Sequence, residues 1–141
     1  MASPRSFAKK MRAFANDIPK QVNEIKKQVV QEIVLQVVPD TPVDTGQARS
    51  NYFTTNGTAN SSIAAFGPFT KDGYQSINRM RVALQGAKPG VSMHVTNNLP
   101  YIGRLNDGYS AQAPANFVQI AIARGQAIIA RQTIRYGVYN G

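Results

Sequence analysis

Cysteine is absent from this chain of 141 residues, which also contains no tryptophan. Without cysteine, disulfides, thiolate nucleophiles and cysteine-ligated zinc are all excluded. A chain of this length buries roughly two-thirds of its unfolded surface on folding, so it can form a core without such cross-links. We therefore expect a single domain over residues 1–141.

Long apolar runs are also absent. No stretch approaches the ~20 apolar residues that a bilayer-spanning helix requires. Residues 1–14 are basic but contain no apolar segment of the kind found in signal peptides. We expect a soluble intracellular protein with no membrane partner.

Groups that perform catalysis are scarce. His94 is the only histidine, and it has no acidic neighbour in the sequence. The seven acidic residues show no metal-binding spacing, and neither a phosphate-binding glycine loop nor a nucleophile elbow occurs. The sequence therefore predicts no catalytic residue, no metal site, no cofactor and no enzymatic activity.

Basic residues outnumber acidic ones by 16 to 7, which gives a net charge of +9. The excess lies at the two ends: residues 1–27 contain seven basic and two acidic residues, and residues 101–141 contain four and one. Such a charge attracts polyanions, of which nucleic acid is the usual one. A solvated surface that only aids solubility explains it equally well, because basic and aromatic residues are not interleaved.

The N-terminal region, residues 4–38, has a helical pattern. Ser3 and Pro4 suit a helix start. Pro19 predicts either a kink or a second helix that begins with Asp17 as its cap, and the helix should end near Val38, before Pro39. One apolar stripe, expected to face the core, consists of Phe7, Met11, Phe14, Ile18, Val22, Ile25, Val29 and Ile33. Lys9, Lys20 and Lys27 lie on the opposite face.

The middle of the chain, residues 47–110, is predicted to be rich in β-structure with one short helix. Strands are expected over residues 47–55, whose start can also be helical, over 63–69, and over 91–96, where Val91, Met93 and Val95 alternate with polar residues. The short helix is expected over residues 76–84, and residues 97–114 should be extended and rich in turns. A C-terminal helix is expected over residues 115–134. Arg124, Arg131 and Arg135 lie within about 40° of each other on its surface.

Two segments carry a specific likeness to a known family. The first is residues 41–52, which begin T-P-V-D-T-G, and the second is residues 96–114. In this order, between a basic N-terminal helix and a C-terminal helix, they resemble the tail-completion, or neck, proteins of long-tailed bacteriophages. The family often has arginine where Gln47 stands, an acidic residue where Asn106 stands, and tryptophan where Tyr52 and Tyr109 stand.

The resemblance implies an α+β fold, with long N-terminal and C-terminal helices packed on a small antiparallel β-sheet. It implies a structural virion protein, part of a hexameric ring at the head–tail junction through which double-stranded DNA passes. Its partners would be adjacent neck, adaptor or stopper proteins and tail-tube or terminator proteins, and it would be found in the host cytoplasm during assembly. A tail-terminator protein and a free sequence-independent DNA-binding protein are the alternatives.

Two sets of candidate site residues follow. Pro42 and Gly46 shape a sharp exit from the first helix, Asp44 can accept hydrogen bonds from backbone amides there, and tyrosines suit interfaces as well as cores. The interface set is Pro42, Asp44, Gly46, Arg49, Tyr101, Arg104 and Tyr109. The set expected to face a DNA-filled lumen or a charged partner is Lys9, Lys20, Lys27, Arg124, Arg131 and Arg135.

Overall fold

The computed structural model describes residues 3–108 and 115–132. These residues form four α-helices, a short 3-10 helix and one antiparallel pair of strands, so the predicted α+β class is confirmed. The elements are α1 (Pro4–Asp40), η1 (Arg49–Asn51), β1 (Phe53–Asn56), α2 (Tyr74–Gln85), β2 (Met93–Thr96), α3 (Ile102–Asn106) and α4 (Phe117–Arg131).

The first helix is longer and less interrupted than predicted. The Ser3 hydroxyl accepts a hydrogen bond from the amide of Ser6 at 3.1 Å, which confirms the predicted cap. The helix then passes through Pro19 without ending, so a second helix capped by Asp17 was a wrong expectation. The end near Val38 was also wrong, because Pro39 lies in the last turn. There a proline removes a single backbone hydrogen bond, and the helix ends one residue later.

The sheet contains two short strands, β1 and β2, paired antiparallel with Phe53 opposite Thr96 and Asn56 opposite Met93. The predicted strand over residues 47–55 begins as the 3-10 helix η1, one of the two possibilities left open. The predicted strand over residues 63–69 is wrong. The side chain of Asn51 holds that segment instead, because it accepts from the amide of Ala64 at 2.7 Å and donates to its carbonyl at 3.1 Å. The extended stretch after residue 97 contains the helix α3.

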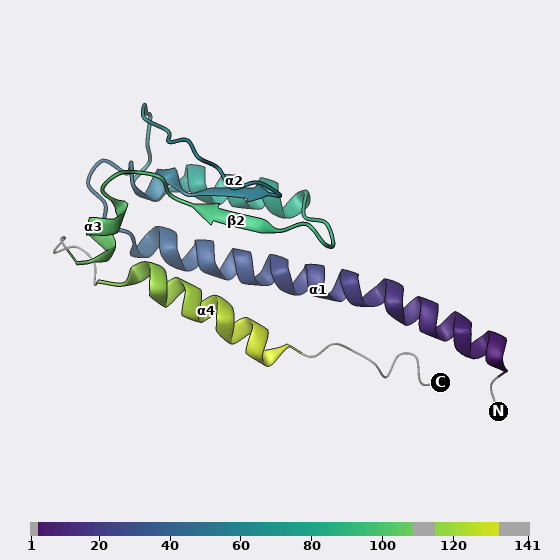
Figure 1. Ribbon diagram of the computed structural model, residues 1–141. Coiled ribbons are helices and arrows are strands. Elements are labelled where there is room, and N and C mark those ends of the chain that lie inside the picture. Colours follow the sequence, from purple (N-terminus) through teal and green to yellow (C-terminus); the bar gives the residue numbers. More distant parts are fainter. Residues whose placement is uncertain (1–2, 109–114, 133–141) are drawn as a thin grey trace.

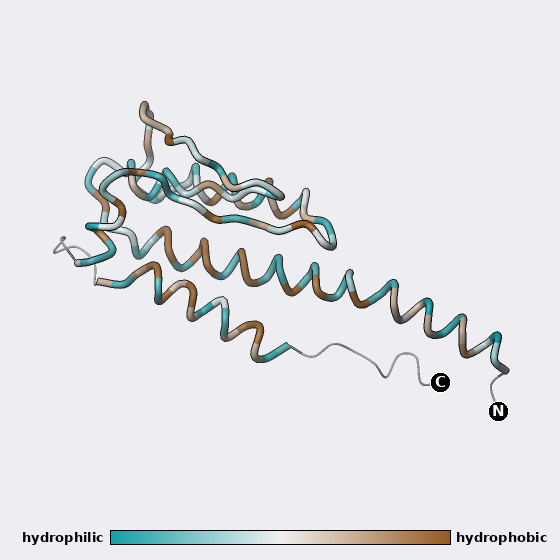
Figure 2. The backbone as a smooth tube through the Cα atoms, in the orientation of Figure 1, coloured by the Kyte–Doolittle hydropathy of each residue, from teal (hydrophilic) through white to brown (hydrophobic). Residues whose placement is uncertain are grey.

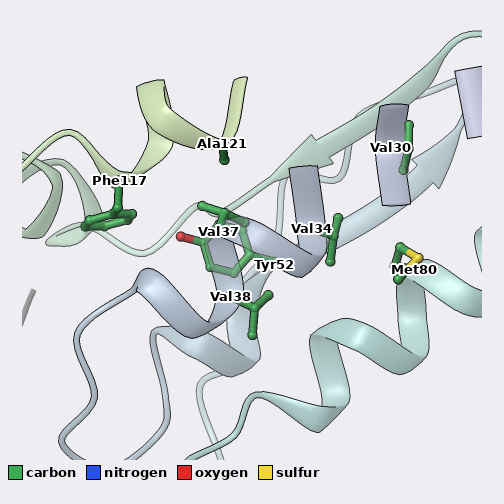
Figure 3. Close-up of a cluster of buried hydrophobic side chains, with 8 residues drawn as sticks. All are labelled: Val30, Val34, Val37, Val38, Tyr52, Met80, Phe117 and Ala121. Carbon is green, nitrogen blue, oxygen red and sulfur yellow. The ribbon is translucent and has the colours of Figure 1, made fainter. Parts of the chain in front are cut away.

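Helix α1 is the centre of the molecule (Figure 1). The sheet and α2 lie on one side of its C-terminal half, and α4 runs antiparallel to it on another side. Eight buried side chains from α1, α2, α4 and the residue between η1 and β1 form the core: Val30, Val34, Val37, Val38, Tyr52, Met80, Phe117 and Ala121 (Figure 3).

Helices α1 and α4 approach closely because α4 presents small residues to α1. Ala121 and Gly125 are buried. A Cβ atom on Gly125 would lie 2.8 Å from Cγ1 of Ile33 and 3.2 Å from Cγ1 of Val29. A larger residue at this position would require the side chain of Ile33 to shift or the two helices to move apart.

The first half of α1 projects past the rest of the fold (Figure 1). We call residues 4–22 the N-terminal arm. Its apolar stripe, visible as repeated brown bands in Figure 2, does not reach the core: Phe7 is 61% exposed and Met11 and Val22 are each 48% exposed. The expectation that the whole stripe faces the core was therefore wrong for these residues, although Val29 and Ile33 face α4. Among the described residues, α4 reaches only to Arg131, where Gln132 bonds to Gln28 at 3.3 Å, and so it does not extend along the arm.

Among the described residues, no helix combines the length and the apolar character needed to cross a membrane.

Candidate functional site

The two segments that carry the family resemblance lie side by side, although about 50 residues separate them in the sequence. The Tyr101 hydroxyl donates to Oε1 of Gln47 at 2.9 Å, and Nδ2 of Asn97 donates to the carbonyl of Ala48 at 3.0 Å. Between them lies a depression of about 390 Å³, which we call the motif pocket. Its lining residues are Pro42, Val43, Asp44, Thr45, Gln47, Ala48, Tyr101 and Leu105.

Arg49 fastens the first segment to the end of α1. Its guanidinium donates three hydrogen bonds to backbone carbonyls: from Nε to Thr41 at 2.6 Å, from Nη1 to Lys71 at 2.9 Å and from Nη2 to Pro39 at 2.8 Å. The carbonyls at a helix C-terminus lack helical partners and carry partial negative charge, so a cation there is doubly favourable. Arg49 therefore holds the turn in place with its half-buried side chain.

Other interface candidates shape the turn itself. Pro42 and Gly46 are buried, and Gly46 has φ +91° with its Cα against the carbonyl of Thr70, so no side chain fits there. Asp44 is exposed. The side-chain bond to a turn amide that we expected of Asp44 comes instead from Thr45, whose hydroxyl accepts from the amide of Gln47 at 3.3 Å.

Tyr52, the last residue of the first segment, is buried in the core. Its hydroxyl shares a 2.7 Å hydrogen bond with the hydroxyl of Thr41. Burial raises the pKa of Tyr52 from 10.0 to about 12, even though the bonds to Thr41 and Asn97 oppose the shift. The Tyr52 hydroxyl therefore links the end of α1, through Thr41, to the second segment, through Asn97.

Two polar residues of α2 hold the backbone of residues 49–52, and the sequence did not predict this role for either of them. Ser76 accepts from the amide of Tyr52 at 3.0 Å and donates to the carbonyl of Arg49 at 2.6 Å. Arg79 donates to the carbonyls of Ser50 at 2.6 Å and Tyr52 at 3.1 Å, and its guanidinium lies 4.0 Å from the ring centre of Phe53. Burial lowers the pKa of Arg79. No local sequence motif predicts these hydrogen bonds, because they depend on how α2 packs against residues 49–52.

Asn106 joins the second segment to α4. Its Oδ1 accepts from the amide of Val118 at 2.9 Å, its Nδ2 donates to the side chain of Gln119 at 2.9 Å, and its carbonyl accepts from the amide of Asn116 at 2.6 Å. The side chain thereby satisfies an amide in the first turn of α4. Arg104, in the same short helix, is exposed.

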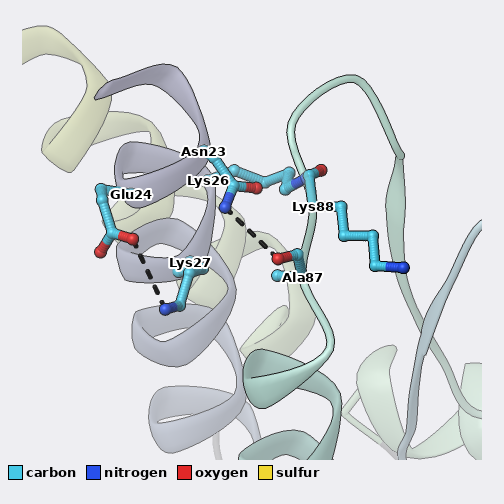
Figure 4. A network of polar contacts seen from close by, with 6 residues as sticks. All are labelled: Asn23, Glu24, Lys26, Lys27, Ala87 and Lys88. Carbon is cyan, nitrogen blue, oxygen red and sulfur yellow. Dashed lines mark hydrogen bonds and ion pairs between the residues drawn. The ribbon is translucent and has the colours of Figure 1, made fainter. Parts of the chain in front are cut away.

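The predicted basic residues lie on separate surfaces. Lys9 and Lys20 are exposed on the arm. Lys27 is half-buried and pairs with Glu24 at 3.6 Å, next to the place where Asn23 bonds the carbonyl of Ala87 (Figure 4). Arg124 and Arg131 are exposed on α4. Helix α4 packs against Val29 of α1, and Val29 lies roughly 160° around the axis of α1 from Lys27. The structure thus forms no single basic surface from the two rows. Tyr109 and Arg135 lie outside the described residues.

A second and larger depression, which we call the apolar groove, runs between α1, α4 and β2 with a volume of about 610 Å³. Its floor is α1 from Lys26 to Val37. Its walls come from β2, α4 and the second segment: Met93, Val95, Asn97, Ile102, Val118, Ala121 and Ile122, with Tyr52 at the base. No local sequence pattern predicts this groove, because its residues come from four distant stretches of the chain.

In the described part of the chain, no group of three or more histidine, aspartate or glutamate side chains is found in a metal-binding arrangement. His94 lies beside the carbonyl of Gly57, with Nε2 at 3.1 Å. The described surfaces are suited to binding by shape, apolar contact and charge.

Comparisons with family models, with curated proteins and with solved structures find no match for this chain.

Proposed function

We propose that this chain is a structural subunit of the neck of a tailed bacteriophage, a tail-completion protein that joins head to tail as one copy of a ring through which DNA passes. The observation that carries the proposal is that residues 41–52 and 96–108, which bear the resemblance, form one unit. They meet through the bond between Tyr101 and Gln47 and together line the motif pocket.

The construction of this unit favours an assembly role over catalysis. Polar side chains in the unit and in the adjacent helix α2 bind its backbone. Arg49 donates to three carbonyls and Arg79 to two, and Ser76 bridges two backbone groups. Such bonds make a rigid surface, which lowers the entropic cost of docking. The motif pocket on this surface is shallow and half apolar, suited to a neighbouring chain in the neck.

The net charge of +9 supports a path for DNA through the ring. Arg124 and Arg131 on α4, with Lys9 and Lys20 on the arm, are exposed and available to a polyanion. Binding of this kind is made to phosphates, depends on salt and is independent of sequence. The same charge supports a second candidate, a free DNA-binding protein, which would bind duplex DNA tightly as an isolated chain.

Genetic deletion tests the proposal directly. In the phage that encodes this chain, a null mutant should accumulate DNA-filled heads and complete tails that remain separate, and purified protein added to the lysate should restore joined particles. A variant with Gly46→Val, which cannot form the turn, is the matched negative control. Joined and infectious particles in the null mutant would rule the proposal out, and tight binding of the isolated chain to DNA would favour the second candidate.

A further inference from the structure

The N-terminal arm and the apolar groove each present exposed apolar side chains within the described part of the chain. On the arm, Phe7, Met11 and Val22 are 61%, 48% and 48% exposed on one face of a helix. In the groove, Ile122 is 44% exposed, and Val29, Ile33, Met93, Val95 and Val118 are only partly covered. Contiguous apolar surfaces of this kind on a folded protein mark sites that another surface covers.

We infer that the N-terminal arm of one copy docks in the apolar groove of a second copy. The inference deepens the proposed function, because it names the two surfaces that would join neighbouring subunits, and its relevance to the neck rests on that function. A contact between two different surfaces of the same chain is head-to-tail. Repetition of such a contact closes into a ring when the rotation between copies permits.

The dimensions of the two surfaces agree. Along the floor of the groove, Lys26 and Val37 are eleven positions apart, and on the arm Phe7 and Ile18 are also eleven positions apart. At ~1.5 Å per residue each stretch is about 16 Å long. The stripe on the arm advances by steps of four, three and four residues, a repeat of eleven that stays on one side of an almost straight helix. Three turns of the arm therefore match the length of α1 that lines the groove.

The chemistry of the groove favours apolar side chains over a polar ligand. Lys26 is the charged residue in its lining, and its amine donates to the carbonyls of Lys88 at 2.8 Å and Val91 at 2.5 Å. The Tyr52 hydroxyl is bonded to Thr41, and the amide of Asn97 to Ala48. Small-molecule sites usually offer a few polar groups that orient the ligand. Here these groups already have partners within the fold.

The arm of one copy could pack against the arm of a second copy or against its groove. The distribution of charge favours the groove. Residues 4–22 contain five basic residues and one acidic residue, so two arms side by side would repel each other. Beyond Val37, where the groove ends, lie Asp40 in the last turn of α1 and the exposed Asp44 in the turn that follows. Arg49 also lies at this end, but its guanidinium is occupied by the carbonyls of Thr41, Lys71 and Pro39. Positive helix N-terminus and negative helix C-terminus then lie together when the arm runs antiparallel to α1.

This orientation predicts which residues meet. If Phe7 lies over Val37, Met11 lies over Ile33, where Ile122 of α4 forms the wall of the groove. The absence of cysteine from the chain makes the contact directly measurable, since introduced cysteines have no background. Met11 and Ile122 are both partly exposed, so Met11→Cys and Ile122→Cys should fold normally.

The experiment mixes the two purified full-length variants under mild oxidation and quantifies disulfide-linked dimers. The matched control mixes Met11→Cys with Val82→Cys, which is 60% exposed on α2 and away from the groove. The M11C/I122C mixture should give on the order of tenfold more mixed dimer than the control, because docking raises the local thiol concentration. Phe7→Glu on the Met11→Cys chain, which places a charge where the arm should lie over Val37, should abolish the excess.

Equal cross-linking in the two mixtures would overturn the inference and assign the groove to a different occupant. Dominant M11C homodimers would also overturn it, because they would mean that arms pair with each other. The outcome is separable from that of the proposed function. A specific cross-link with no copy of the chain in virions would leave the contact standing and reject the neck role, whereas the reverse result would reject only this contact.

Discussion

The Tyr101 hydroxyl donates a 2.9 Å hydrogen bond to the side-chain oxygen of Gln47, and this bond spans the two sequence segments that carry the family likeness. Around it, the chain uses buried polar groups to hold backbone rigidly, with Arg49 at the end of α1 and Asn106 at the start of α4. The described part of the fold therefore presents a fixed surface at one end and a projecting helical arm at the other (Figure 1).

Replacing Arg49 with alanine should destabilise the fold strongly. Three backbone carbonyls lose a charged donor, and one hydrogen bond to a charged group contributes roughly 1.5–3 kcal/mol, so a loss of about 3 kcal/mol is expected. Arg49→Lys should retain only part of this, because an ammonium group cannot reproduce the planar fork. Urea unfolding measures the effect. Arg81→Ala, at an exposed position of α2, serves as the control and should change stability by less than about 0.5 kcal/mol.

Gly125→Ala tests the contact between α1 and α4. The new Cβ would lie 2.8 Å from Cγ1 of Ile33. Overpacking costs about 1–3 kcal/mol, whereas alanine in place of glycine in a helix gains about 1 kcal/mol, so a net loss of about 1 kcal/mol is expected. On an Ile33→Ala background the same substitution should become stabilising. Gly103→Ala in α3, where a Cβ meets nothing within 4 Å, should be neutral or slightly stabilising. Additive effects at positions 125 and 33 in denaturant titrations would contradict the contact.

Stability should fall at high pH because of Tyr52. Its pKa is about 12 in the folded protein and 10.0 in the unfolded chain, so its contribution is complete below pH 10 and is lost as pH rises toward 12. Linkage gives a loss of about 1.4 kcal/mol by pH 11. Lysines also titrate in this range, so the measurement is the difference between the native chain and Tyr52→Phe in urea titrations from pH 8 to pH 11. A constant difference across that range would show that Tyr52 ionises normally.

Asn106→Ala should loosen α4 by removing the bond to the amide of Val118, at a cost of about 1–2 kcal/mol. Asn106→Asp should remain close to the native stability, because a carboxylate accepts the same bond and is favoured at a helix N-terminus, while the Gln119 amide can turn to donate to it. Thermal melts followed by circular dichroism at neutral pH compare the two variants. Equal destabilisation by alanine and aspartate would show that Asn106 acts by packing alone.

Arg124→Glu combined with Arg131→Glu should leave folding intact and reduce assembly or DNA retention. Both arginines are exposed on α4, so the charge reversal disturbs no buried contact. The yield of DNA-filled particles, measured by complementation of the null mutant, reports the effect. Arg81→Glu, a single charge reversal at an exposed position of α2, provides the control. Normal yield and unchanged DNA retention in the double variant would mean that this row faces solvent.

Periodicity predicted the elements of the fold well but not which surfaces are covered. The stripe from Phe7 to Ile33 correctly predicted a long amphipathic helix, yet it carries no information on the length of the partner helix. Because α4 reaches only to the level of Gln28, the first part of the stripe is exposed. Val30, Val34 and Val38 lie outside the stripe and are buried nonetheless, since α2 and the sheet cover a second side of α1.

The turn residues of the candidate site could be predicted from the sequence. The residues that hold its backbone in place from other elements could not. The turn at Gly46 follows from local chemistry, because glycine tolerates φ +91°. The roles of Ser76, Arg79 and Asn106 depend on long-range packing, which leaves no mark at short spacing in the sequence. Residues 63–69 illustrate the same difficulty: their composition suits a strand, but the side chain of Asn51 takes the backbone bonds that a neighbouring strand would have made.

The central claim is that this chain works as a repeated structural part of a phage neck, and imaging of the assembled particle by cryo-electron microscopy tests it most directly. The account predicts a closed ring of copies of this fold between head and tail, with DNA or an open channel at its centre. Complete neck density into which no copy of this fold can be placed would contradict it.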